Sequence, residues 1–232
     1  MIALRKSSAR GYAHHGWLES WHSFSFADYH DPAHVRFASL RVINEDIVQP
    51  NRGFAMHPHR DMEILTYILD GALRHHDSMG NSEMIRAGEV QVMSAGTGVT
   101  HSEVNASDTE AVHLLQIWIM PAQQNLPPGY QQKYFGASAK RGRWCLLASP
   151  DQAVGSLLVH QDVRVSAALL DGAETLSYSV QAGRKIYLHV ARGALSANGQ
   201  SLNPGDALMY SDEANVELAA GIDAEVLLFD MA

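Results

Sequence analysis

Residues 53–63 read Gly53-Phe54-Ala55-Met56-His57-Pro58-His59-Arg60-Asp61-Met62-Glu63. If this stretch is extended, His57 and His59 point to one face, because side chains alternate along a strand. A second pair with the same spacing, His101 and Glu103, follows later in the chain. Two neighbouring strands would then bring three imidazoles and one carboxylate together. That donor set suits a first-row transition metal better than Mg²⁺ or Ca²⁺, which prefer oxygen ligands alone.

From Val35 onward the dominant pattern is alternation with period two or short apolar runs, both typical of β-strands. The segments with this pattern are residues 36–43, 62–69, 90–93, 113–120, 143–147, 157–160, 163–170, 176–180, 185–191, 207–210, 216–219 and 224–229. Turn signals such as Asp70-Gly71 and Asn203-Pro204-Gly205 separate them. No long helical pattern occurs. The chain is therefore predicted to be all-β, a jelly-roll type of sandwich or barrel.

Residues 11–34 show neither a helical nor a strand period, although they are rich in aromatic side chains. We expect an irregular segment anchored by these aromatics. The alternative is a segment that wraps over the mouth of a pocket.

A weak internal repeat divides the chain. Residues 71–73 (Gly-Ala-Leu) return at residues 193–195, and residues 87–90 resemble residues 204–207. This predicts two β-barrel domains, residues 1–135 and 136–232. The positions that correspond to the histidine and glutamate pairs in the second half are Ser179, Gln181, Lys185, Leu218 and Ala220. Because these residues preserve no ligand set, we expect one metal site, in the first half.

The composition narrows the functional classes. In 232 residues, 46% are hydrophobic and 18% charged, which is typical of a globular protein, and the net charge is -8. An acidic chain gives no support to direct nucleic-acid binding. The single cysteine, Cys145, cannot form an internal disulfide or a thiolate metal site. With no apolar segment of membrane-spanning length, we expect a soluble, cytoplasmic protein without a membrane partner.

These residues resemble the cupin superfamily and, within it, the pirin family. Residues 53–63 with Gly71 match the first cupin signature, and Gly88 with residues 94–105 matches the second. The first glycine lies closer to His57 than is usual, Ser94 replaces the usual proline, and the gap before His101 is longer, as in pirins themselves. Further pirin-like strings are residues 16–18, 22–29, 57–60, 63–67 and 94–98. The resemblance is specific over most of residues 2–135.

The resemblance implies a bicupin with one metal centre, whose ligands would be His57, His59, His101 and Glu103. One divalent transition metal per chain is expected, with Fe(II) preferred and Zn, Ni, Co, Mn or Cu as alternatives. Glu63 is a rival carboxylate ligand, since in many cupins the glutamate after His-x-His binds the metal. It could instead be a neighbour that hydrogen-bonds a ligand.

The resemblance also implies a function, a metal-dependent dioxygenase similar to quercetin 2,3-dioxygenase. Such an enzyme opens a flavonol ring with O₂ and releases carbon monoxide. Glu103 would then also be catalytic, as the base that accepts the 3-hydroxyl proton of the substrate. The alternative function is a non-enzymatic iron-binding pirin, a redox-sensitive regulatory module that binds another protein.

Overall fold

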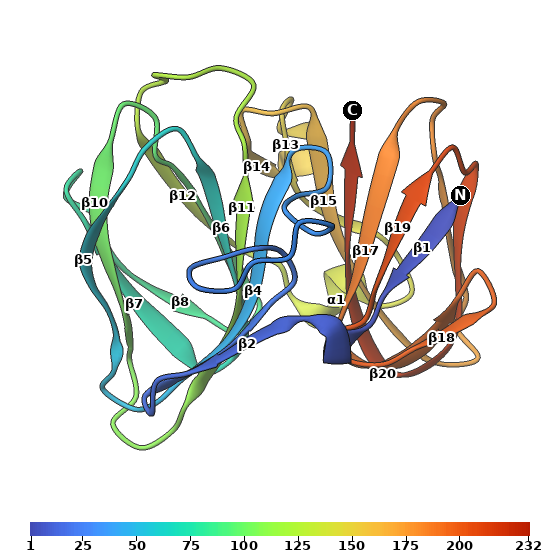
Figure 1. Cartoon of the computed structure of the whole chain (residues 1–232), viewed down its shortest axis with the longest axis horizontal. Coiled ribbons are helices and arrows are strands. Elements are labelled where there is room, and N and C mark those ends of the chain that lie inside the picture. Colours follow the sequence, from blue (N-terminus) through green and yellow to red (C-terminus); the bar gives the residue numbers. More distant parts are fainter. The chain divides into compact units, whose positions relative to one another are not determined.

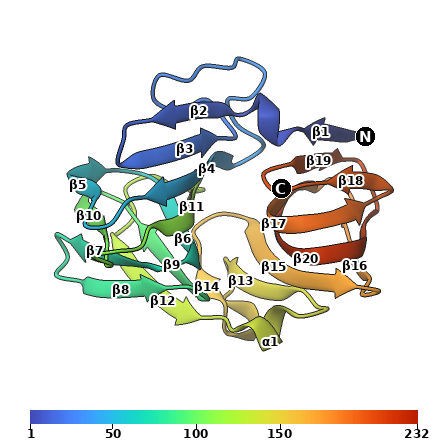
Figure 2. The same cartoon turned by 90° about the horizontal axis from the view of Figure 1, so that it is seen from below.

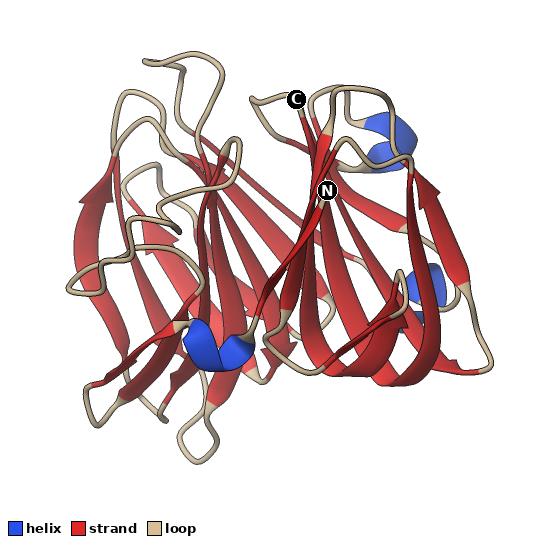
Figure 3. Ribbon diagram, turned by 45° about the vertical axis from the view of Figure 1, so that its right-hand side comes forward, coloured by secondary structure: helices blue, strands red, loops and turns tan.

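A computed structural model describes all 232 residues, and almost every regular element in it is a β-strand (Figures 1 and 3). This confirms the predicted all-β class. The helical elements are limited to α1 (Ala137–Lys140) and two 3₁₀ turns, Ser7–Ala9 and Ala153–Gly155. No helix is long and apolar enough to cross a membrane.

The chain forms two compact units. We call them the N-terminal unit (residues 11–134 and 157–161) and the C-terminal unit (residues 1–10, 135–156 and 162–232). These ranges differ from a single boundary after residue 135 by two short segments, residues 1–10 and 157–161, and by Phe135, which belongs to the C-terminal unit. Residues 1–10 join the C-terminal unit because β1 (Ile2–Arg5) pairs antiparallel with β19 (Ala207–Ser211). Residues 157–161 join the N-terminal unit, where the Leu158 amide donates to Gln131.

The N-terminal unit contains a seven-stranded sheet of order β12-β9-β6-β11-β4-β3-β2 and a four-stranded sheet of order β5-β10-β7-β8 (Figure 2). The bounds are β2 (Gly11–His14), β3 (Leu18–His22), β4 (Leu40–Val48), β5 (Gly53–His59), β6 (Glu63–Asp70), β7 (Ala72–Asp77), β8 (Ser82–Arg86), β9 (Glu89–Ser94), β10 (Val99–Asn105), β11 (Val112–Ile119) and β12 (Gly129–Tyr134). Segment 157–161 adds the short β14 (Leu157–Leu158).

The register of the larger sheet aligns polar side chains in one row. His22 faces Asn44, Asn44 faces Gln116, and Gln116 faces Thr66 across four adjacent strands. In each strand the residue two positions away lies on the same face. Four neighbouring strands thus present polar side chains on a face that is normally apolar. Three of these side chains, His22, Asn44 and Gln116, line the cavity described below.

Residues 11–34 were predicted to be irregular, and this is wrong for β2 and β3. The inward positions of β3 include Ser20 and His22, which are buried despite being polar. Because these inward positions are hydrophilic, the period-two hydrophobic signal is lost although the strand is regular. The next predicted strand, residues 36–43, actually begins at Leu40 as β4.

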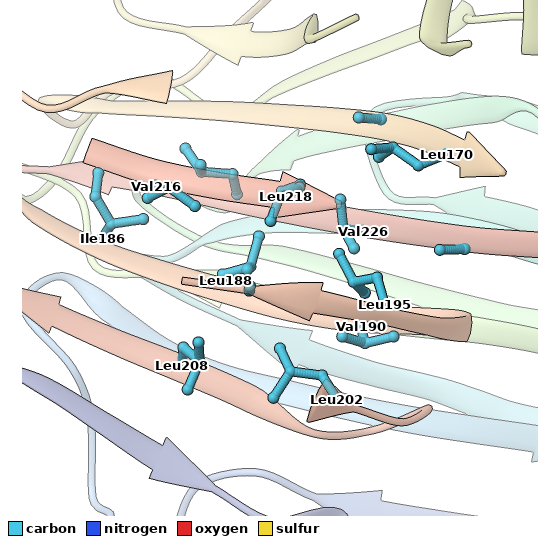
Figure 4. Packing of buried hydrophobic residues seen from close by; sticks show 14 of the residues in the cluster. Leu170, Ile186, Leu188, Val190, Leu195, Leu202, Leu208, Val216, Leu218 and Val226 are labelled. Carbon is cyan, nitrogen blue, oxygen red and sulfur yellow. The ribbon is translucent and has the colours of Figure 1, made fainter. Parts of the chain in front are cut away.

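The C-terminal unit has the strand order β1-β19-β17-β20-β15-β13, and β16 and β18 pair with β20 and β17. The bounds are β13 (Cys145–Ser149), β15 (Val163–Gly172), β16 (Leu176–Ser179), β17 (Lys185–Ala197), β18 (Gln200–Leu202) and β20 (Asn215–Met231). Its interior is apolar, with Leu188, Val190, Leu195, Leu218 and Val226 fully or almost fully buried (Figure 4). Both groups of possible metal ligands in the chain lie outside it, in the N-terminal unit.

Candidate metal centre

Strands β5 and β10 bring three of the predicted ligands together. In the antiparallel register His101 faces His57, and Val99 faces His59. One nitrogen from each of His57, His59 and His101 lies within 4.8 Å of the others. Their ring centroids are 4.5 to 4.9 Å apart. We call these residues the histidine triad. Three imidazoles at this spacing can bind one metal ion, because all offer nitrogen lone pairs to the same space.

Hydrogen bonds determine which nitrogen of His57 is free. Its Nδ1 lies 2.7 Å from the carbonyl oxygen of Ala55. A carbonyl only accepts hydrogen bonds, so Nδ1 carries the proton and Nε2 keeps its lone pair. In His101, Nε2 is buried and has no hydrogen-bond partner. Buried polar atoms are almost always paired, so this nitrogen fits a metal ligand.

A chain of buried groups lies behind His101. The His75 Nε2–H donates to Asp77 Oδ2 at 2.9 Å, and the two Nδ1 atoms of His75 and His101 are 3.5 Å apart. Since His75 uses its proton on Asp77, its Nδ1 can only accept. The proton between the rings therefore belongs to His101 Nδ1, which leaves His101 Nε2 free to bind a metal.

Asp77 is well suited to be the anionic end of this chain. Burial acts to raise its pKa, but hydrogen bonds from His75, from the Asn81 side chain and backbone, and from the Met79 amide lower it overall. Burial also lowers the pKa of His75, although its bond to Asp77 opposes this. His75 therefore stays neutral beside an ionised Asp77. This is the arrangement that orients a metal-binding imidazole.

We expect Asp77→Asn and His75→Gln to weaken metal binding by about 10- to 100-fold, because the tautomer and orientation of His101 would no longer be fixed. Competition with a chromophoric chelator measures this affinity. Asp108→Asn is the control, since Asp108 is exposed and is not part of the hydrogen-bonded series His101, His75 and Asp77. If both variants fold normally and keep the wild-type metal affinity, then His75 and Asp77 do not orient His101 for metal binding.

Glu103 is the fourth predicted ligand, and the structure places it at the edge of the histidine triad. One of its oxygens lies within 4.8 Å of ligand nitrogens of His75 and His101, not of all three triad nitrogens. Thr66 Oγ1 and Gln116 Nε2 donate to its two oxygens at 3.2 and 2.8 Å. Burial raises the pKa of Glu103 to about 7, with the charge of Asp46 adding and the two hydrogen bonds opposing.

Two of the triad imidazoles, those of His59 and His101, are uncharged near neutral pH. Burial, reinforced by the charge of His57, lowers the pKa of His59 to about 4. Burial also lowers the pKa of His101 to about 3, with the charges of the neighbouring histidines adding. Metal binding requires deprotonated ligands. These two imidazoles therefore need not lose protons before a metal ion binds.

The rival ligand Glu63 lies apart from the triad. It is buried, and its carboxylate accepts hydrogen bonds from Ser94 Oγ at 2.9 Å and from the His160 amide at 3.1 Å. In one uninterrupted strand Glu63 would share a face with His57 and His59, but a turn with Asp61 at φ 48° separates β5 from β6. Alternation within β6 then puts Ile64 on the cavity side and Glu63 on the other.

The histidine triad and Glu103 line a cavity of about 770 Å³, which is in the range of small-molecule sites. Its other lining residues are Tyr12, Ala13, His15, Trp17, Leu18, Ser20, His22, Phe26, Ala27, Asp28, Tyr29, Asn44, Asp46, Phe54, Ile64, Gln116 and Trp118. Trp118 packs edge-on against His59 and Phe26, with centroids 5.0 and 5.5 Å away. The wall is therefore largely aromatic.

Two polar side chains of β11, three residues apart, lie on opposite faces of the strand. Gln116 faces the cavity and holds Glu103, whereas His113 bonds Glu45 at 2.9 Å. Sequence reasoning missed Thr66, His75 and the polar positions of β3 and β4. The signal was present for the last group, since polar residues occupy alternate positions 20 and 22, and 44 and 46.

Asp46 allows a test of pH dependence in the metal-free protein. Burial raises its pKa from 3.8 to about 7. Between these values the folded protein holds a proton that the unfolded chain has released. The stability from this group is thus complete below about pH 4 and lost as the pH rises through about 7. Asp46→Asn should raise Tm by a few degrees at about pH 8 and hardly at about pH 4. Parallel Tm curves for the two proteins would contradict this.

Comparisons of sequence and of structure with known proteins both support the pirin family. The family model "Pirin" matches residues 4–119, and "Quercetinase C-terminal cupin domain" matches residues 146–231. The chain is 48% identical over 231 residues to a quercetin 2,3-dioxygenase of Escherichia coli K12, covering 100% of this chain and 99% of the relative.

Two crystal structures from Escherichia coli are similar over the whole chain. YhhW has a TM-score of 0.96 and 48% identity, covering 100% of this chain and 98% of the other. The bacterial pirin YhhW in complex with nickel(II) has a TM-score of 0.95 and 47% identity, covering 100% and 99%. These matches confirm the predicted bicupin fold, two jelly-roll β-barrel domains.

Proposed function

The chain belongs to the pirin family, and on this basis we propose that it is a metal-dependent dioxygenase acting on flavonols. The observation that carries the proposal is the histidine triad, which lies with Glu103 in the wall of a largely aromatic cavity. The relative named quercetin 2,3-dioxygenase supports this substrate class, and the nickel(II) complex of bacterial YhhW supports a divalent metal.

The residues that would hold the metal are His57, His59, His101 and Glu103. The buried, unpaired Nε2 of His101 fits this role, as does the lowered pKa of His59 and of His101, which keeps both imidazoles neutral. We propose one divalent ion per chain, Fe(II) by preference, with Zn, Ni, Co, Mn and Cu as alternatives. Such an ion would lower the pKa of a flavonol 3-hydroxyl and make its electrons available to O₂.

Glu103 is the proposed acceptor of the 3-hydroxyl proton. A general base works best when its pKa lies near the operating pH, and burial raises that of Glu103 to about 7. Thr66 and Gln116 fix its orientation through hydrogen bonds to both oxygens. Gln116 Nε2 and Thr66 Oγ1 can keep their bonds whether Glu103 is ionised or holds the proton on an oxygen facing the cavity.

The aromatic wall would position the substrate. Trp118 lies against His59, and Trp17 and Phe54 pack edge-on with centroids 5.4 Å apart. Flat aromatic rings pack well against such side chains. Their apolar surfaces also exclude water from the bond-breaking step, which protects reactive species from hydrolysis.

The proposed reaction consumes one flavonol and one O₂. Two carbon–carbon bonds break, those joining C3 to C2 and to C4, and C3 leaves with its oxygen as carbon monoxide. Both atoms of O₂ enter the ring-opened ester. Electrons balance because the flavonol is oxidised by the O₂ that is consumed.

The test is aerobic incubation of the Fe(II)-loaded protein with quercetin, while flavonol absorbance and dissolved O₂ are followed. We expect equal consumption of flavonol and O₂ and none with the metal-free protein. Bound metal without consumption of quercetin would contradict the proposal and would support the alternative, a non-enzymatic iron-binding module.

A further inference from the structure

One wall of the cavity carries four buried polar side chains that the proposed chemistry at the metal does not use. They come from β3 and β4 and are Ser20, His22, Asn44 and Asp46. Each of them is at most 4% exposed. In the register Ser20 faces Asp46, and His22 faces Asn44. Their side chains thus form two cross-strand pairs on the inner face of the sheet.

The hydrogen bonds within these pairs leave two atoms unpaired. Ser20 Oγ donates to Asp46 Oδ1, and His22 Nδ1 bonds Asn44 Oδ1 at 2.9 Å. Neither Asp46 Oδ2 nor Asn44 Nδ2 has a hydrogen-bond partner in the protein. Neither atom is among the fully buried side-chain atoms without a partner, so both keep some accessible surface although their side chains are almost entirely buried. Because both residues line the cavity, a bound molecule can satisfy the two atoms.

The two unpaired atoms differ in chemistry, and this selects the ligand group. Asp46 Oδ2 needs a donor when ionised, and Asn44 Nδ2 needs an acceptor. A hydroxyl both donates and accepts, whereas an ammonium only donates and a carboxylate only accepts. The aromatic wall around the pair favours a planar, apolar frame for that hydroxyl.

We propose that Asp46 and Asn44 form a binding subsite for a ring hydroxyl of a planar aromatic ligand. The subsite is separate from the metal-binding position. Asn44 faces Gln116, which holds Glu103, and Asp46 lies two residues further along β4, roughly 7 Å along the strand. The inference deepens the proposed function, on which it rests, by requiring the flavonol to carry a hydroxyl distant from its 3-hydroxyl.

The test uses flavones that lack the 3-hydroxyl, so that chemistry at the metal does not enter. Unsubstituted flavone, 7-hydroxyflavone and 4′-hydroxyflavone are titrated into metal-free protein, and quenching of tryptophan fluorescence gives each Kd. Trp17 and Trp118 line the cavity and report binding. We expect at least one hydroxyflavone to bind wild-type protein about tenfold more tightly than flavone.

In Asp46→Ala and Asn44→Ala, the Kd of flavone should stay nearly unchanged. The ratio of the Kd of flavone to the Kd of the preferred hydroxyflavone should fall from about ten to close to one. Asp46→Asn keeps an acceptor oxygen and should recover part of the preference. The matched control is Glu45→Gln, since Glu45 is adjacent in β4 but bonds His113 and does not line the cavity. If Asp46→Ala does not fold, Asn44→Ala carries the same test.

Two results would overturn the subsite. One is that neither hydroxyflavone binds wild-type protein better than flavone. The other is that the preference persists in both alanine variants, which would place the hydroxyl elsewhere in the cavity. A protein with the expected preference but no quercetin turnover would instead contradict the proposed dioxygenase and leave the subsite standing.

Discussion

Replacing His101 by alanine is expected to reduce metal affinity by more than about 100-fold and to abolish flavonol consumption. His101 is the most buried member of the histidine triad, and its Nε2 has no other partner in the protein. Alanine removes one of the proposed ligands and leaves two histidines of the triad. His57→Ala should have the same effect, although His57 is more accessible. Metal content after gel filtration, measured by mass spectrometry, checks both variants.

The control for these variants is His76→Ala. His76 lies in β7 next to His75 but is exposed and belongs to neither group of possible ligands. We expect it to keep one metal ion per chain and full activity. Metal content that is equally high in His101→Ala, His57→Ala and His76→Ala would mean that the metal binds outside the triad.

Glu103→Gln is expected to lower kcat by about 10² to 10⁴ with a much smaller change in KM. Glutamine preserves the side-chain shape and can still accept from Thr66, but it cannot take a proton from the substrate. In the wild type the Gln116 amide donates a hydrogen bond to Glu103. The new glutamine amide group can place two donors against each other there, so the Tm of the variant must be measured together with its kinetics. Rates should be compared at equal metal content, because glutamine is also a weaker ligand.

Glu63→Gln separates the two carboxylates. Glu63 is held by Ser94 and His160 outside the cavity, so this substitution should affect stability without changing metal content or kcat. Loss of the metal in Glu63→Gln, together with full activity in Glu103→Gln, would reverse the assignment of the two residues.

The sequence predicts the parts of the site that depend on strand alternation. His57 and His59, and likewise His101 and Glu103, share a face because they are two residues apart, and all four line the cavity. Their strands pair antiparallel, although the register shifts between His101 and Glu103. Gln116 and His113 lie on opposite faces of β11 because they are three residues apart. Such predictions succeed because a strand has a fixed period, whatever its neighbours are.

Other features depend on which strands become neighbours, and alternation alone does not determine this. The position of Glu63 illustrates the point, since the turn at Asp61 changes the face that β6 presents. His75 comes to lie behind His101 only because β7 pairs with β10. The tautomer of His101 then follows from Asp77, which is two residues beyond His75. The sequence around His101 gives no sign of this connection.

Polar positions caused the main error in the predicted fold. Strands β2 and β3 were expected to be irregular, because a hydrophobic pattern is sought at inward positions and Ser20 and His22 are polar. Inward-facing polar residues on a regular strand are costly unless they are satisfied. Their presence on β3 and β4 is therefore itself an indication of a binding cavity.

The central claim is that the N-terminal unit uses its metal to catalyse flavonol dioxygenation, and oxygen-18 labelling tests it most directly. Fe(II)-loaded protein is mixed with quercetin under isotopically labelled O₂, and the products are analysed by mass spectrometry. We predict a ring-opened ester that contains both labelled atoms, together with unlabelled carbon monoxide in equal amount. An unlabelled or singly labelled product, or oxidation of quercetin without carbon monoxide, would contradict the claim.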